Sequence, residues 1–233
     1  MIRMVVFDMA GTTVNEDNVV YKTIQKAFIE EGIDVSLEQV LQHGAGKEKL
    51  QAIKDILFEV FQISNEQLAS KIHLAFKEHL VRAYEDLHVT PVEGAEDVFR
   101  FLKHSGIFCV LNTGYDSKTA NGLLKKLGWD RSDLINGVVT ASDVPKSRPF
   151  PDMIEAAMRK TGVNNPLEVI KIGDSTVDIK EGQNAGCGLN IGITGGAQTR
   201  KQLEEQGPDF VIDHLVELIH IIKRENTPTS FVY

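Results

Sequence analysis

The chain has 233 residues, of which 42% are hydrophobic and 25% charged, a composition typical of a globular protein with a substantial apolar core. Its 33 acidic residues outnumber its 25 basic ones, and the net charge of −8 weighs against nucleic acid and anionic membranes as partners. Only two cysteines, no signal-peptide pattern and no apolar run long enough for a bilayer lead us to expect a cytoplasmic protein with reduced thiols.

The first predicted element is a strand from Ile2 to Asp8, whose β-branched and apolar residues indicate burial on both faces. Only helical patterns follow it, and the predicted helices cover about 18–31, 47–61 and 65–85. Strands and helices then alternate as helix 95–106, strand 107–113, helix 117–127, strand 137–141, helix 151–160, strand 169–174, helix 177–185, strand 189–194 and a last strand–helix pair ending at 223. We expect 224–233 to be a loose tail.

This alternation predicts an α/β fold with a doubly wound parallel sheet, because parallel strands need crossover helices between them. The helix-only block does not fit the sheet and indicates a small all-helical domain inserted after the first strand. We therefore expect a core domain made of 1–15 and 86–233, interrupted by a helical domain of 16–85.

Small polar or acidic residues stand where three of the predicted strands end, namely Asp8, Thr113 and Asp174. Ligands of open parallel sheets bind beyond the carboxyl ends of the strands. A single aspartate in such a place commonly caps the next helix, but three such residues together favour a functional site.

Asp174 and Asp178 in IGDSTVD flank the expected start of a helix, so that the loop brings the two carboxylates together. With Asp8 they could hold a hard cation such as Mg²⁺, which prefers carboxylate oxygens. The seven histidines show no zinc-ligand spacing, and the GITGGA stretch lacks the spacing of a dinucleotide site and predicts an ordinary loop.

The groups expected around the cation suit a phosphoryl group. Thr113, together with the backbone N–H groups of Thr113 and Gly114, can donate to an anionic oxygen. The VPKSRPFPDM loop brings Lys146 and Arg148 to the same edge of the sheet, and arginine binds phosphate with two parallel hydrogen bonds. Asp8 could then attack phosphorus and form an aspartyl-phosphate while Mg²⁺ neutralises both anions.

The stretches VVFDMAGTTV, LNTGY, DVPKSRPFP and KIGDSTVDIKEGQNAG resemble, in chain order, the four motifs of the haloacid dehalogenase (HAD) superfamily. The resemblance implies a HAD-like Rossmann-type core with a helical cap domain, and a hydrolase that uses Asp8 as nucleophile. It also implies that Mg²⁺ is held by Asp8, the Ala10 carbonyl and Asp174, with Asp178 in support. The substrate is then expected to contact Gly11, Thr12, Thr113, Gly114, Tyr115, Arg148 and Gly46.

Ala10 stands where most HAD phosphatases carry a second aspartate, the general acid for the leaving oxygen. The DMAGTTV stretch, Tyr115 and Arg148, which replaces a common lysine, resemble instead the phosphonoacetaldehyde hydrolase (phosphonatase) branch. In that branch a cap lysine forms a Schiff base with the substrate aldehyde. The resulting iminium accepts the electrons of the breaking carbon–phosphorus bond, so that no acid is needed at position 10.

The cap motif of this branch is a glycine followed three residues later by the Schiff-base lysine, and Gly46 and Lys49 in GAGKEKLQAI have this spacing. Lys47 is a close competitor, and an ordinary solvated first helical turn is the plain alternative for both lysines. Ala52 stands where the branch has a histidine that shuttles protons, and Ala45 stands where it has a methionine.

Together these patterns predict a Mg²⁺-dependent, phosphonatase-like hydrolase of a small phosphonylated or phosphorylated metabolite, acting as a monomer or homodimer. One alternative is a phosphomonoesterase for phosphoglycolate or a sugar phosphate, against which Ala10 weighs. Another is a non-catalytic protein that binds a phosphorylated metabolite, against which the intact Asp8 and Asp174 weigh.

Overall fold

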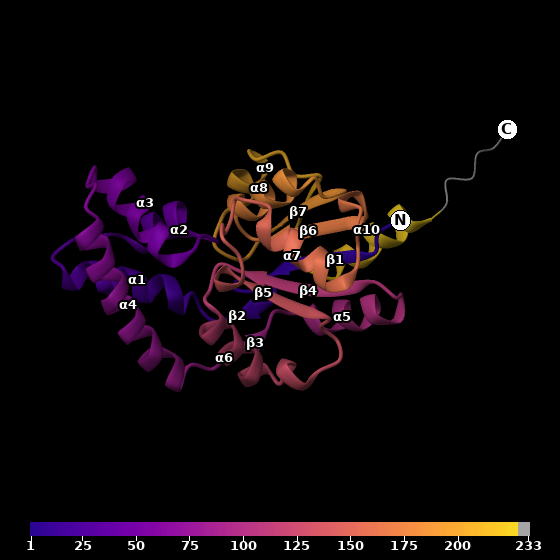
Figure 1. Ribbon diagram of the computed structural model, residues 1–233, viewed down its shortest axis with the longest axis horizontal. Coiled ribbons are helices and arrows are strands. Elements are labelled where there is room, and N and C mark those ends of the chain that lie inside the picture. Colours follow the sequence, from indigo (N-terminus) through magenta and orange to yellow (C-terminus); the bar gives the residue numbers. More distant parts are fainter. Residues whose placement is uncertain (228–233) are drawn as a thin grey trace.

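The computed structural model describes residues 1–227, apart from the side chains of 84–86. Its main sheet has six strands, all parallel, in the order β5-β4-β1-β6-β7-β8. They are β1 (Met4–Asp8), β4 (Phe108–Thr113), β5 (Gly137–Thr140), β6 (Val169–Gly173), β7 (Leu189–Ile193) and β8 (Phe210–Ile212). The chain adds strands first on one side of β1 and then on the other, which confirms the doubly wound α/β fold (Figure 1).

Helices cover both faces of this sheet because both faces of its central strands are apolar. They are α5 (Ala95–His104), α6 (Ser117–Leu127), α7 (Asp152–Thr161), α8 (Thr176–Ala185), α9 (Arg200–Glu204) and α10 (Glu217–Asn226). Side chains of β1 alternate between two apolar clusters, with Val5 and Phe7 in one and Met4 and Val6 in the other. The sheet is therefore a buried, rigid platform for the side chains at its edge.

A second block of helices lies at the carboxyl ends of the strands (Figure 1). It consists of α1 (Val19–Glu30), α2 (Leu37–Gly44), α3 (Lys49–Phe61) and α4 (Glu66–Asp86). The helix α2 is missing from the sequence prediction. It is only eight residues long, but Ser36 and Gln39 form a capping box at its start, and this signal could have located it.

Two short strands join the helical block to the sheet. β2 (Val14–Asn15) and β3 (Thr90–Pro91) pair antiparallel where the chain leaves the core and where it returns. We infer that this pair marks the boundary between a core domain (1–15 and 86–233) and a cap domain (16–85).

Two further details differ from the sequence expectation. The short helix α9 lies in a stretch for which no helix was predicted, and α10 continues to Asn226 instead of ending at 223. The rest of the predicted tail, 228–233, lies outside the described residues. Among the helices of residues 1–227, none combines the length and the apolar character that crossing a bilayer would need.

Candidate active site

The strand ends bring the predicted carboxylates together. Asp8 is the last residue of β1, Asp174 directly follows β6, and Asp178 lies in the first turn of α8. All three are buried, and one carboxylate oxygen from each lies within 4.8 Å of the others. The topology thus produces the acidic cluster that the sequence predicts.

Asp174 is held by glycine-rich backbone on two sides. The backbone N–H of Ala197 donates to Asp174 Oδ2 at 2.6 Å. A β-carbon on Gly11 or Gly196 would overlap the Asp174 carboxylate, and Gly11 also has a positive φ of 83°. Burial raises the pKa of Asp174 well above its ordinary value, and the charges of Asp8 and Asp178 add to the effect.

Arg148 binds the nucleophile candidate directly. Its Nη1 lies 2.6 Å from Asp8 Oδ1 and 3.1 Å from Asp178 Oδ1. Its Nη2 donates to the carbonyl and side-chain oxygens of Asn112 at 2.9 and 2.6 Å, and its Nε donates to Glu181 Oε2 at 3.0 Å. Burial raises the pKa of Asp8 although the Arg148 charge lowers it. The guanidinium is therefore fixed in one orientation against Asp8.

A second buried cation, Lys171 on β6, completes this network. Its Nζ lies 3.0 Å from Asp178 Oδ1, 3.2 Å from Glu181 Oε2 and 2.6 Å from Asn112 Oδ1. Asn112 Nδ2 in turn donates to Glu181 Oε1 at 2.9 Å. Asn112, Lys171 and Glu181 were not predicted as site residues from the sequence. The only signal in the sequence is that polar residues interrupt two otherwise apolar strands.

The expected phosphate-binding residues lie around this network. Thr113 is buried at the end of β4, and its Oγ1 accepts a hydrogen bond from the Tyr115 N–H at 3.2 Å. Thr12 Oγ1 is buried and has no hydrogen-bond partner among the described residues. An unpartnered buried hydroxyl is costly, so this group is suited to donate to a bound anion.

The cap loop packs directly onto these core loops. A β-carbon on Gly114 would lie 2.8 Å from the Gly46 carbonyl oxygen, so the two backbones touch. The same carbonyl accepts from Arg148 Nη1 at 3.3 Å, and the Gly46 N–H donates to the Tyr21 hydroxyl at 3.1 Å. Gly46 has a φ of 72°, which favours glycine there.

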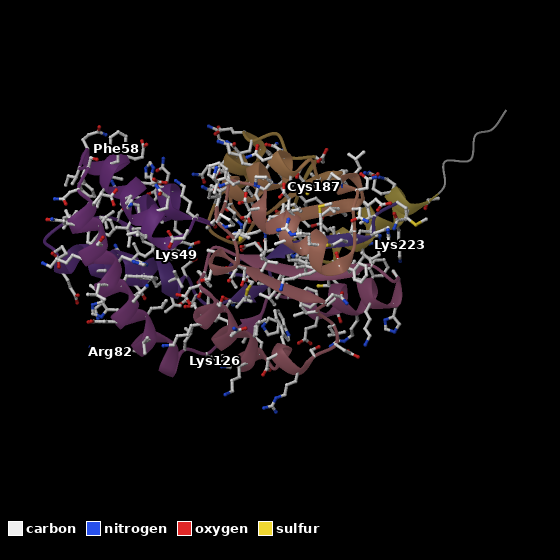
Figure 2. All side chains as sticks on the ribbon, viewed as in Figure 1. Lys49, Phe58, Arg82, Lys126, Cys187 and Lys223 are labelled. Carbon is white, nitrogen blue, oxygen red and sulfur yellow. The ribbon has the colours of Figure 1, made fainter. Side chains whose placement is uncertain are left out.

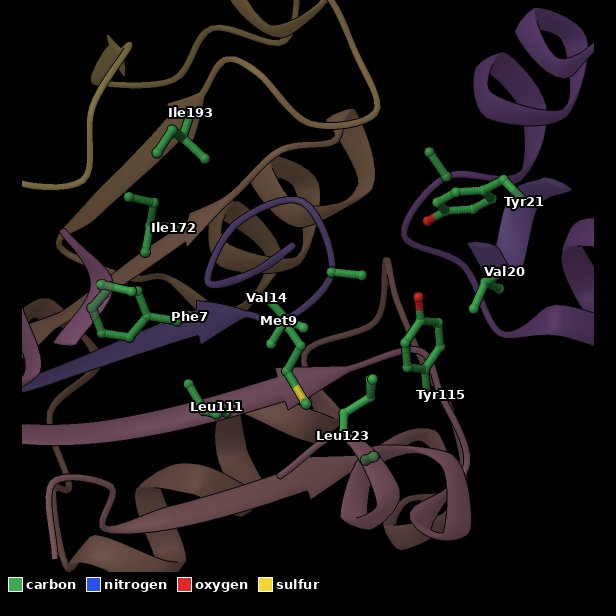
Figure 3. Packing of buried hydrophobic residues seen from close by; sticks show 14 of the residues in the cluster. Phe7, Met9, Val14, Val20, Tyr21, Leu111, Tyr115, Leu123, Ile172 and Ile193 are labelled. Carbon is green, nitrogen blue, oxygen red and sulfur yellow. The ribbon is translucent and has the colours of Figure 1, made fainter. Parts of the chain in front are cut away.

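Lys49 is the cap lysine that faces the site. Its Nζ lies 5.3 Å from the ring centre of Tyr21 and 4.9 Å from that of Tyr115, and it donates to the Lys47 carbonyl at 2.7 Å. Figure 2 shows Lys49 on the side of the helical block nearest the sheet, and Figure 3 shows the two rings at the junction of cap and core. Burial lowers the pKa of Lys49 to about 8, against the opposing charges of Asp8 and Glu16.

The competing lysines have other surroundings. Lys47 pairs with Asp55 at a partly exposed position. Lys146, expected beside Arg148, is exposed, and its Nζ lies 4.8 Å from the ring centre of Phe150. The structure therefore brings Arg148 and Lys49 into the site and leaves Lys47 and Lys146 at its margin.

Two cavities flank the buried cluster. One, of about 240 Å³, is lined by Lys49, Tyr115, Gly114, Glu48 and His73. The other, of about 830 Å³, lies between cap and core and includes Arg148 in its wall. A small ligand thus has space next to Lys49, whereas the Arg148 side chain is fully covered by its protein partners.

Both alanines that depart from common patterns are buried. Ala10, which is 8% exposed, has only a methyl group at the position where the resemblance to HAD phosphatases implies an acid. Ala52 is fully buried on α3, and a β-carbon on Gly44 of α2 would already lie 3.4 Å from its methyl group. This spacing leaves no room for an imidazole on that side of Ala52.

Comparisons with known proteins agree with this geometry. Residues 5–191 match the family described as haloacid dehalogenase-like hydrolase. The chain is 30% identical over 223 residues to a phosphonoacetaldehyde hydrolase of Bacillus mycoides, covering 89% of this chain and 83% of that protein. Among solved structures, a phosphonoacetaldehyde hydrolase like protein from Oleispira antarctica superposes with a TM-score of 0.83 at 22% identity, covering 96% of this chain and 92% of that one. A predicted phosphoglycolate phosphatase from Haemophilus somnus gives 0.77 at 19% identity, covering 95% and 98%.

Proposed function

The chain belongs to the haloacid dehalogenase-like hydrolase family, in its phosphonatase-like branch, and from this premise we propose that it cleaves the carbon–phosphorus bond of a small phosphonate aldehyde such as phosphonoacetaldehyde. The observation that carries the proposal is Lys49, a buried amine between two tyrosine rings, close enough to Asp8 for that carboxylate to affect its pKa. An amine with a pKa of about 8 is available as the free base at neutral pH far more often than an ordinary lysine.

The acidic cluster fits a bound Mg²⁺. The buried network contains four carboxylates, Asp8, Asp174, Asp178 and Glu181, against the two cations Arg148 and Lys171. A divalent cation would balance this excess of negative charge. Asp8, Asp174 and the Ala10 carbonyl would hold it. Asp178, whose oxygens contact Arg148, Lys171 and Ser175, would support the site from behind. The bound ion would supply positive charge as two anions approach each other.

The chain's own residues would act in sequence. Lys49 attacks the aldehyde carbon, and loss of water leaves a protonated imine. Thr113 and Thr12 donate to the phosphonyl oxygens, and the Arg148 guanidinium, which contacts Asp8 through Nη1, holds that carboxylate in line with phosphorus and adds positive charge beside it. As the Asp8 oxygen bonds to phosphorus, the electron pair of the carbon–phosphorus bond moves into the imine and gives a neutral enamine.

This route explains why an alanine suffices at position 10. The leaving group is a carbon whose electrons are taken up by the Lys49 iminium, so no oxygen needs to be protonated as it departs. Water then hydrolyses the aspartyl-phosphate, and protonation and hydrolysis of the enamine release the aldehyde and restore Lys49. Asp8 and Arg148 are 4% and 5% exposed, so their burial excludes bulk water from the first step.

The test is phosphate release with Mg²⁺ from phosphonoacetaldehyde and from phosphoglycolate, measured side by side. We expect release from the phosphonate and reductive trapping of Lys49 by borohydride. Release from the ester alone would contradict the proposal and favour a phosphomonoesterase. Saturable binding of both compounds without phosphate release would favour a non-catalytic binding protein.

A further inference from the structure

A buried acid that the mechanism above does not use lies beside Lys49. Glu16 follows β2 in the segment that enters the cap, and it is 2% exposed. Tyr115 donates its hydroxyl to Glu16 Oε1 at 2.7 Å, and the contact joins positions 99 residues apart in the sequence. A fully buried glutamate is rare unless something in its surroundings requires it.

The Glu16–Tyr115 pair lies next to the Lys49 amine. The Tyr115 ring is one of the two that flank Lys49 Nζ, at 4.9 Å. The Glu16 charge acts on Lys49 and favours its protonated form. Carboxylate, phenol and amine therefore form one contiguous buried group. Figure 3 shows its Tyr115 ring at the junction of cap and core.

Imine formation needs a group that both takes and returns a proton. The amine must lose a proton before it attacks, and the hydroxyl of the carbinolamine must gain one before it leaves as water. Ala52 offers no such group, and its buried position leaves no room for one on the side of Gly44. Among the described residues, Glu16 and Tyr115 are an acid–phenol pair whose phenol ring contacts the Lys49 amine.

We propose that Glu16, acting through the Tyr115 hydroxyl, accepts the proton that Lys49 loses before it attacks the aldehyde. Glu16 then returns this proton to the carbinolamine hydroxyl as the imine forms. Glu16 is a positioning residue and proton reservoir, and Tyr115 is the catalytic residue. This inference rests on the proposed function, because it assumes that Lys49 meets an aldehyde.

The protons and charges balance in this scheme. The Lys49 ammonium gives a proton through Tyr115 to Glu16, which becomes neutral. The free amine adds to the carbonyl, and its remaining extra proton moves to the carbonyl oxygen. Glu16 then returns its proton through Tyr115 to the carbinolamine hydroxyl, which leaves as water, and the iminium and the Glu16 carboxylate remain.

The experiment uses acetaldehyde as the probe, because it can form the imine but has no phosphorus to transfer. The full-length protein is incubated with acetaldehyde for increasing times and quenched with borohydride, and ethylated Lys49 is measured by mass spectrometry. Glu16→Gln keeps an acceptor for the Tyr115 hydroxyl but cannot hold the proton. Tyr115→Phe keeps the ring but cannot pass the proton on. Glu30→Gln, which removes a carboxylate on the outer side of the cap, is the matched control.

We expect the rate of trapping to fall about 100-fold in both variants and to stay unchanged in the control, with the same final amount of ethylated Lys49 in all. A proton carrier changes the rate, whereas displacement of Lys49 would lower the final amount as well. If Glu16→Gln does not fold, Tyr115→Phe carries the test alone.

Two results would overturn the inference. Equal trapping rates in the wild type and both variants would refute the role of Glu16 and leave the proposed function standing. No trapping at Lys49 in the wild type would refute both, and phosphate release from phosphonoacetaldehyde then tells independently whether carbon–phosphorus cleavage occurs by another route.

Discussion

Arg148→Lys tests whether the fixed guanidinium, and not only its charge, is needed for phosphoryl transfer. A lysine ammonium can replace the contact of Nη1 with Asp8, which is now 2.6 Å long. It cannot at the same time make the contacts of Nη2 with Asn112 and of Nε with Glu181. The variant therefore keeps the charge and loses the orientation.

The expected decrease in kcat/KM depends on which of the Arg148 contacts other residues can replace. Asn112 Oδ1 and Glu181 Oε2 keep their contacts with Lys171, so neither is left as an unpaired buried group. What is lost is the fixed orientation of the cation against Asp8, which we set equal to one charge-assisted contact, a cost of about 1.5–3 kcal/mol. This corresponds to a decrease of about 10- to 150-fold in kcat/KM. Because the buried positive charge is retained, we expect the variant to fold.

The assay is steady-state phosphate release from phosphonoacetaldehyde at saturating Mg²⁺, with thermal unfolding measured in parallel. Lys146→Met is the matched control, since Lys146 lies in the same loop and is exposed, with its Nζ over the ring of Phe150. It should stay within about twofold of the wild type. An Arg148→Lys enzyme as active as the wild type would refute the reasoning, because charge alone would then suffice.

Three further predictions concern the other parts of the site. Lys49→Met should abolish borohydride trapping, whereas Lys47→Met should keep it. Because the attacking amine must be neutral and its pKa is about 8, the trapping rate should rise about tenfold from pH 7 to pH 9 and then level off. A rise centred near the pKa of an ordinary lysine would contradict this. EDTA should stop phosphate release, and added Mg²⁺ should restore it. Asp174→Asn should raise the Mg²⁺ concentration that gives the half-maximal rate by about tenfold or more, and titration of the rate with Mg²⁺ would detect or exclude this change. Ala10→Asp should increase phosphoglycolate hydrolysis by about tenfold or more through a new general acid, and unchanged ester hydrolysis would show that the missing acid does not limit that reaction.

The sequence predicts the parts of the site that lie at the ends of strands. Asp8, Thr113 and Asp174 each follow an apolar run, and the rule that parallel strands end at one edge is enough to group them. The order of strands and helices could be predicted for the same reason, since each apolar period is a local signal. The helical insertion could also be predicted, because the segment after the first strand shows only helical patterns of apolar residues.

Contacts between distant elements could not be predicted. Asn112 meets Glu181 across 69 positions, and Lys171 meets Asn112 across 59, and no local pattern encodes such pairs. Lys47 and Lys49 look alike in sequence, and only the helix start that turns Lys49 inward distinguishes them. The GITGGA stretch predicted an ordinary loop, but in the fold its Gly196 makes room for the Asp174 carboxylate.

The groups proposed to activate the Lys49 amine are divided between the cap and the core, and this division would protect the amine from unwanted aldehydes. Glu16 and Lys49 belong to the segment between β2 and β3, whereas Tyr115 follows β4 in the core. Since Asp8 and Arg148 are buried, we expect a substrate to reach them when the two blocks move apart, and such a movement would separate Lys49 from Tyr115. Exposed to water, Lys49 would have the pKa of an ordinary lysine and would be protonated at neutral pH. An aldehyde other than the substrate would then meet an unreactive side chain, and the amine would become nucleophilic only around an enclosed molecule.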